Sequence, residues 1–159
     1  MFKRIYIVLI SLFIFVQYVD VSYGASGNGG DTYLDLYKQG KQFVVRAKKM
    51  EKKNKIEKAK KLYSKASEKL KEANKVERNN PDILNYLGFS LRKNGKFEEA
   101  EKFYLQGLKI KPDHNGINEY LGELYIETGR KKLAEGRLAV LKNCNCEEYE
   151  ELKKVIDKN

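Results

Sequence analysis

The fold is decided at residues 81–114, which have the sequence PDILNYLGFSLRKNGKFEEAEKFYLQGLKIKPDH. Part of this pattern returns 34 residues later. The recurring residues are Leu87-Gly88 with Leu121-Gly122, Gly95 with Gly129, and Ala100 with Ala134. Two copies at one spacing predict that the chain repeats a single structural unit.

The spacing within the first copy predicts two helices. Leu84, Leu87 and Leu91 lie three and four residues apart, so they share one helix face. Gly95 then favours a helix end, because glycine adopts the left-handed conformation at little cost. The second helix would be lined by Phe97, Ala100, Tyr104, Gly107 and Leu108. Small residues among them would let two helices pack closely.

These residues resemble the tetratricopeptide repeat, a helix–turn–helix unit of 34 residues. The matching positions are Leu84, Leu87, Gly88 and Leu91 in the first helix, Ala100, Tyr104 and Gly107 in the second, and the terminal Pro112. The second copy, residues 115–145, departs at Asn118, where a bulky residue is usual, and lacks the terminal proline. The resemblance implies an all-α, right-handed superhelix of about three helical hairpins that binds another protein. Residues 122–156 also resemble small exported bacterial tetratricopeptide proteins.

The rest of the chain is expected to supply the neighbours that such a repeat needs. Residues 32–80 predict a degenerate, basic hairpin whose first helix begins at Thr32, with Asp35 at capping-box spacing. Its extended tip would lie at residues 48–55. Residues 146–159 predict a capping helix over residues 131–141, with the apolar stripe Tyr149, Leu152, Val155 and Ile156.

The first 24 residues have the order of a secretory signal peptide. Lys3-Arg4 precedes the apolar residues 5–16, and Ser22-Tyr23-Gly24 places small residues before Ala25. Such a segment would direct export of the protein to the periplasm and would be cleaved before Ala25.

An uncleaved inner-membrane anchor over residues 5–19 is the alternative. Its 15 residues are fewer than the roughly 20 that a spanning helix needs. Residues 25–31, rich in glycine, predict a flexible leader.

Positive charge is concentrated in the first hairpin. The protein carries a net charge of +10, and residues 38–78 contain 16 Lys or Arg against 5 Asp or Glu. Residues 79–159 contain 14 of each. This asymmetry is typical either of a solvated lysine face or of a surface for an anionic partner, such as a polyanion or a membrane surface. Lysine outnumbers arginine and few aromatic residues are interleaved, which argues against nucleic-acid binding.

The resemblance also implies a binding groove lined by the first helix of each repeat. The corresponding residues here are Asn85, Phe89, Arg92, Glu119, Glu123 and Ile126. An extended peptide or a partner helix would suit this mixture of apolar, basic and acidic groups. Phe89 is expected to be an exposed aromatic anchor. The lysine-and-asparagine pattern by which some family members bind C-terminal carboxylates is absent.

The two cysteines, Cys144 and Cys146, leave three interpretations open. They could form a structural disulfide or packed thiols, a redox-active pair, or a Cu(I) site. Zinc would need further ligands, and the chain has a single histidine, His114, expected as an exposed turn residue.

No sequence motif for catalysis is present, and we expect neither a cofactor nor a metal. The leading hypothesis is a non-enzymatic scaffold or adaptor that is exported to the periplasm and binds a protein or peptide. The alternatives are a thiol-redox or copper-handling protein that uses Cys144 and Cys146, and a polyanion or membrane-surface binder that uses residues 38–78.

Overall fold

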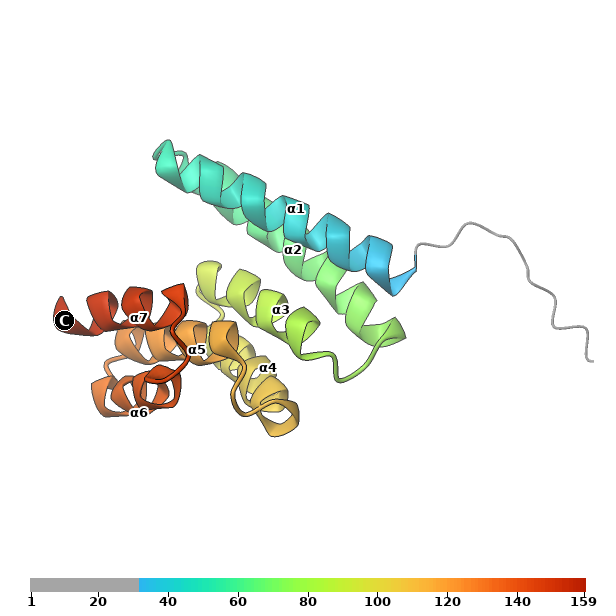
Figure 1. Ribbon diagram of the computed structural model, residues 1–159. Helices are drawn as coiled ribbons and strands as arrows, with labels where there is room; N and C mark the ends of the chain where they lie inside the picture. The colour runs from blue at the N-terminus through green and yellow to red at the C-terminus, as the bar shows by residue number, and fades with distance from the viewer. Residues whose placement is uncertain (1–31) are drawn as a thin grey trace, which may run out of the picture.

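The computed structural model describes residues 32–159, which form seven α-helices and no strand (Figure 1). The expected all-α repeat fold is therefore confirmed for this part of the chain. The predicted signal peptide (residues 1–24), anchor (residues 5–19) and leader (residues 25–31) lie outside the described residues. Among residues 32–159, no helix combines the length and the apolar character needed to cross a membrane.

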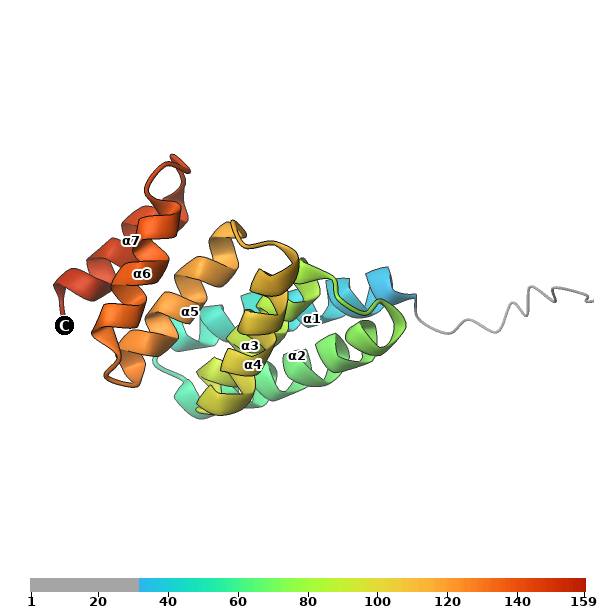
Figure 2. The same ribbon diagram turned by 90° about the horizontal axis from the view of Figure 1, so that it is seen from below.

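The helices follow one another as antiparallel pairs. These are α1 (Tyr33–Lys52) with α2 (Ile56–Val76), α3 (Pro81–Lys93) with α4 (Phe97–Ile110), and α5 (Asn115–Glu127) with α6 (Lys131–Leu141). A further helix, α7 (Glu147–Asp157), follows the third pair. The pairs stack in chain order, as Figure 2 shows. Each first helix also contacts the next one, from α1 through α3 and α5 to α7.

Local signals fix the helix ends. Thr32 and Asp35 form the predicted capping box, in which the Asp35 N–H donates to the Thr32 hydroxyl and the Thr32 N–H to the Asp35 carboxylate. Asn80 caps α3 through its side-chain oxygen, and Pro81 takes the first helical position. Gly95 follows α3 with φ of +74°, a conformation that favours glycine.

The prediction that His114 is an exposed turn residue is wrong. Its side chain is only 11% exposed and caps α5, because Nδ1 accepts a hydrogen bond from the N–H of Ile117 at 3.2 Å. The other ring nitrogen, Nε2, lies 3.2 Å from a carboxylate oxygen of Asp82 on α3. His114 therefore also links the second and third pairs.

Close packing between the helices depends on glycines that face large side chains. A methyl group added to Gly88 would lie 2.6 Å from the ring of Tyr104, which is fully buried between α3 and α4. A methyl group added to the other three helix-packing glycines would likewise meet a large side chain too closely: Gly40 with Leu70, Gly107 with Ile117, and Gly122 with Leu152. These contacts bring the helices closer than a β-carbon would allow.

Helix α7 occupies the place that the first helix of a fourth pair would take. It contacts α6, as predicted, but packs more extensively against α5. Leu152 is fully buried against Gly122, and Ile156 is 6% exposed. Helix α7 therefore continues the row of first helices, and most of its charged side chains are exposed.

The Gly88–Tyr104 contact generates a prediction about stability. Gly88→Ala is expected to lower the free energy of unfolding by about 1–3 kcal/mol, because the added methyl displaces a buried ring. Urea denaturation followed by circular dichroism measures the change.

Gly136 provides the matched control, because it lies within α6 with open space around its β-carbon position. Gly136→Ala is expected to raise the free energy of unfolding by about 0.5–1 kcal/mol through its higher helix propensity. Equal stability of the two variants would contradict the close contact at Gly88.

Candidate functional site

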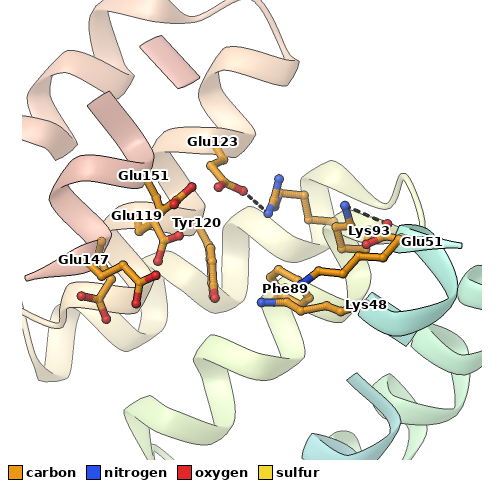
Figure 3. A pocket seen from close by; sticks show the side chains of 12 residues that line it. Lys48, Glu51, Phe89, Lys93, Glu119, Tyr120, Glu123, Glu147 and Glu151 are labelled. Carbon is orange, nitrogen blue, oxygen red and sulfur yellow. Dashed lines mark hydrogen bonds and ion pairs between the residues drawn. The ribbon is translucent and has the colours of Figure 1, made fainter. Parts of the chain in front are cut away.

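A groove of about 630 Å³ opens along the four first helices, α1, α3, α5 and α7 (Figure 3). Each of these helices contributes side chains to its lining. The stacking of the pairs creates the groove, because it aligns the same side of each first helix. Its position matches the surface that the family resemblance indicated.

Two aromatic rings form the base of the groove. The ring centroids of Phe89 and Tyr120 lie 4.7 Å apart, and Tyr63 packs edge-on against Phe89 at 5.8 Å. Phe89 is only 4% exposed, so the prediction of an exposed anchor is wrong. Its ring is enclosed by Tyr63, Tyr120 and the cations of Lys48 and Arg92, whose charged ends lie 4.7 and 5.5 Å from the ring centroid. Tyr120 is the more accessible ring.

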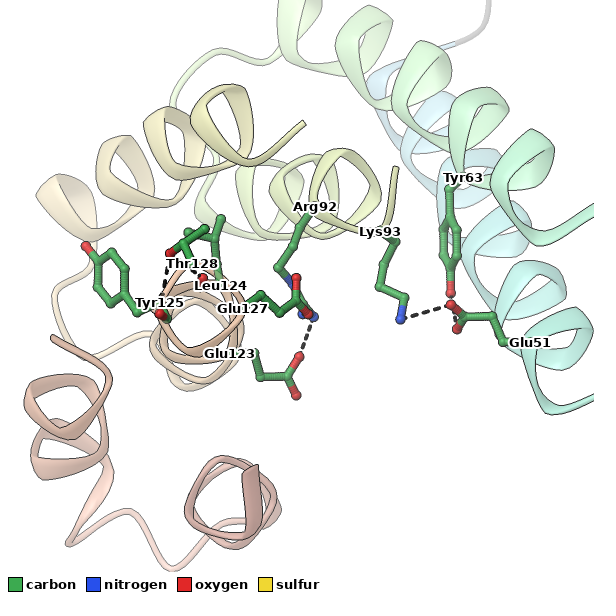
Figure 4. Close-up of polar contacts among 9 residues, drawn as sticks. All are labelled: Glu51, Tyr63, Arg92, Lys93, Glu123, Leu124, Tyr125, Glu127 and Thr128. Atoms are coloured by element: carbon green, nitrogen blue, oxygen red, sulfur yellow. Dashed lines mark hydrogen bonds and ion pairs between the residues drawn. The ribbon is translucent and has the colours of Figure 1, made fainter. Parts of the chain in front are cut away.

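One side of the groove, here named the basic wall, consists of Lys48 and Lys52 of α1 and Lys93 of α3. Lys93 pairs with Glu51 at 2.9 Å, and Glu51 also accepts a hydrogen bond from the Tyr63 hydroxyl at 2.8 Å (Figure 4). Lys48 and Lys52 are exposed and form no ion pair within residues 32–159. Their charge is therefore available to a ligand.

Arg92 lies deep between the second and third pairs, with 4% of its surface exposed. Its guanidinium donates hydrogen bonds to Glu123 and Glu127 of α5, as Figure 4 shows. A planar guanidinium can satisfy two carboxylates at once and holds them in a fixed geometry. Much of the charge on Arg92 and Glu123 is thus used to join neighbouring repeats.

The opposite side, here named the acidic wall, consists of Glu119 of α5 and Glu147, Glu148 and Glu151 of α7. The three α7 glutamates form no ion pair among the described residues, and Glu147 and Glu151 are exposed. The two walls face each other across the aromatic base (Figure 3). The groove therefore carries charges of opposite sign on its two sides.

Glu119 is the deepest member of the acidic wall. It is 8% exposed and forms no hydrogen bond or ion pair within the described part of the chain. Its pKa is raised to about 8, chiefly by burial and then by the carboxylates of Glu123 and Glu148. Lys48 and Arg92 act in the opposite direction. Most Glu119 carboxyls are therefore protonated at neutral pH.

Four of the six residues predicted to bind a partner line this groove: Phe89, Arg92, Glu119 and Glu123. The other two do not. Asn85 is 7% exposed, and its amide nitrogen lies close to Gly116 at the start of α5. Ile126 is half-buried and packs against the core.

The sequence alone did not indicate the basic wall, Tyr120 or the α7 glutamates as part of the groove. Helix α1 is out of phase with the 34-residue repeat, so the repeat could not select Lys48 and Lys52 among so many lysines. Glutamates are favourable at the N-terminus of a helix because that end is positive. The glutamates of α7 therefore gave no reason to predict a groove. Their spacing, with Glu147 and Glu151 four residues apart on one face, was the available signal.

Cys144 and Cys146 form a disulfide in the connection between α6 and α7, with Cα atoms 5.2 Å apart. Both side chains pack against the core. The bond leaves no free thiol among the described residues and does not favour the redox or copper-handling alternatives. Within residues 32–159, no group of three His, Cys, Asp or Glu side chains is placed to hold a metal ion.

Comparison with known proteins agrees with the helical repeat. The tetratricopeptide repeat profile matches residues 81–114. Protein O-mannosyl-transferase TMTC3 of Mus musculus is 32% identical over 69 residues, 43% of this chain and 8% of that protein. The Homo sapiens protein of the same name is 36% identical over 61 residues, 38% of this chain and 7% of that protein. The chain thus spans less than a tenth of these relatives. The second helical pair of this chain, residues 81–114, therefore matches the tetratricopeptide repeat both in sequence and in its helix–turn–helix arrangement.

Proposed function

We propose that this chain is a non-enzymatic interaction module that holds a segment of another protein in the groove. The observation that carries the proposal is the groove itself: about 630 Å³, an aromatic base and unpaired charges on both walls. Aromatic side chains supply contact area at binding surfaces, and complementary charges supply specificity. The repeat at residues 81–114 supports it, because such repeats typically bind protein partners.

A scaffold role also agrees with the chemistry of the groove. Its polar residues are lysines, an arginine, glutamates and Tyr120, and no serine, threonine, cysteine or histidine among the described residues lines it. The relatives are named as transferases, but the match covers 8% or less of their length. The general role of a repeat such as residues 81–114 is interaction.

Binding in the groove can be tested by selecting peptides from a random display library on the wild-type protein. The variant Lys52→Glu/Glu147→Lys reverses an exposed charge on each wall. Selected peptides are expected to bind this variant at least about tenfold more weakly in fluorescence anisotropy, because one charge on each wall then repels the group that it attracted before.

The control variant, Lys132→Glu/Glu135→Lys, makes the same charge changes on exposed residues of α6, outside the groove. Peptide affinity is expected to stay within about twofold of the wild type. Peptides that tolerate the groove variant, or a selection that enriches none, would overturn the proposal.

We also propose that the protein acts in the periplasm, on the basis of the charged, apolar and small-residue order of residues 1–24. The mature protein purified from the periplasmic fraction is expected to begin at Ala25 and to have the corresponding intact mass. Recovery in the membrane fraction with residues 5–19 retained would favour the anchored alternative instead.

A second candidate function is binding to an anionic membrane surface through the first pair. The specific observation is a shallow hollow of about 530 Å³ near the α1–α2 turn, which combines cations with apolar side chains. It is lined by Arg46, Lys49, Lys53, Lys58 and Lys61, with Met50 and Leu62. The nearby Val45 is 66% exposed. Such a surface suits an anionic lipid layer.

This candidate predicts sedimentation with vesicles that contain phosphatidylglycerol. Binding is expected to fall sharply at high salt and in a Lys58→Glu/Lys61→Glu variant, because the attraction is electrostatic and screened by ions. The variant Lys131→Glu/Lys132→Glu makes the same change in net charge on exposed residues of α6 and serves as control. Salt-independent binding, or no binding at low salt, would exclude a charged-surface role.

A further inference from the structure

Within the acidic wall, Glu119 differs from the other glutamates in being almost fully buried. Glu119 is 92% buried, lines the groove and has no hydrogen-bond or ion-pair partner within residues 32–159. Burial of most of this residue removes water from around its carboxyl, and a ligand that pairs with the carboxyl offsets that cost. Figure 3 shows Glu119 beside Tyr120, on the side of the groove formed by α5 and α7.

We propose that the acidic wall binds a basic side chain, lysine or arginine, of an extended segment of another protein, with Glu119 as its innermost contact. This inference rests on the proposed function and names the chemistry of the segment that the groove accepts.

Charge and shape both favour a basic side chain. Glu147, Glu148 and Glu151 surround the outer part of the site, while Glu119 closes its inner end. The Tyr120 ring beside them offers an apolar surface for the methylene groups of lysine or arginine. A metal ion fits less well, because these carboxylates do not converge into a coordinating group.

The basic wall restricts the segment further. Lys48 and Lys52 face the acidic wall with no carboxylate partner in the described chain. A segment with only basic residues would be repelled by them, and a segment with only acidic residues would be repelled by the acidic wall. The preferred segment therefore carries charges of both signs, with its acidic residue toward α1.

Binding should also release a proton. The groups that face Glu119 are Lys48 of α1, Arg92 of α3, Glu123 of α5 and, on α7, chiefly Glu148 with Glu147 and Glu151 nearby. In the free protein the pKa of Glu119 is about 8, so the carboxyl is mostly neutral at pH 7. A cation placed against it favours the charged form. Affinity should then rise with pH until the free carboxyl is itself ionised.

The first test uses the groove-binding peptides selected above, each synthesised with its basic residues and with norleucine in their place. The basic form is expected to bind at least about tenfold more tightly to the wild type. Glu119→Gln is expected to remove most of this difference, whereas Glu135→Gln, an exposed α6 position, should leave it unchanged.

The second test follows affinity between pH 6 and pH 8. The wild type should gain up to about tenfold per pH unit, and Glu119→Gln should show little of this dependence. Calorimetry in buffers of different ionisation enthalpy should detect a released proton for the wild type only.

Thermal denaturation of the free protein provides a readout without any peptide. The pKa of Glu119 is about 4.5 in the unfolded chain and about 8 in the folded protein. Ionisation of this carboxyl therefore destabilises the fold progressively as the pH rises through this range. Glu119→Gln should therefore gain melting temperature over the wild type across this range. A variant that loses stability throughout would contradict the unpaired burial of Glu119.

The remaining outcomes separate the two proposals. Groove-binding peptides that need no basic residue overturn this inference and leave the proposed function standing. Failure to select any groove-binding peptide overturns both. Self-association of the protein that Glu119→Gln abolishes would identify a second copy of the chain as the occupant and would also overturn the inference.

Discussion

The structure depends on a steric constraint that recurs along the array: a glycine faces a large side chain of another helix. Gly88 meets Tyr104 within the second pair, and Gly122 meets Leu152 between α5 and α7. Each contact lets two helices approach closely, which aligns the first helices and creates the groove between them. The packing that stabilises the fold therefore also determines the shape of the candidate site.

The sequence predicted the fold well because these contacts leave a local pattern. Glycine, alanine and leucine at fixed steps identified the helices, and the 34-residue period identified the pairs. The site was less predictable, since it depends on how the pairs are oriented. Phe89 lies on the expected helix face, yet Tyr63 and Tyr120 from neighbouring pairs bury its ring. No spacing within residues 81–114 contains that information.

Charge performs two different tasks in this molecule. Arg92 is buried and joins α3 to Glu123 and Glu127 of α5, so its charge is used within the fold. Because the desolvation of buried charges offsets much of their attraction, we expect these pairs to contribute more to the geometry of the α3–α5 contact than to net stability. Lys48, Lys52 and the α7 glutamates have no such partner in the described chain, and their charge remains at the groove. The distinction is invisible in a count of charged residues, because both sets look alike in the sequence.

Helix α7 carries three of the four glutamates of the acidic wall, and this has a consequence for the dynamics of the site. Helices with few buried side chains open at a lower free energy than the centre of a domain, as native-state hydrogen exchange detects, and α7 buries only Leu152 and Ile156. Detachment of α7 would separate Leu152 from Gly122 and expose more of Glu119. The same event would remove Glu147, Glu148 and Glu151 from the groove and would leave Glu119 as the remaining carboxyl of the acidic wall. The acidic wall is therefore complete only while this one helix stays docked.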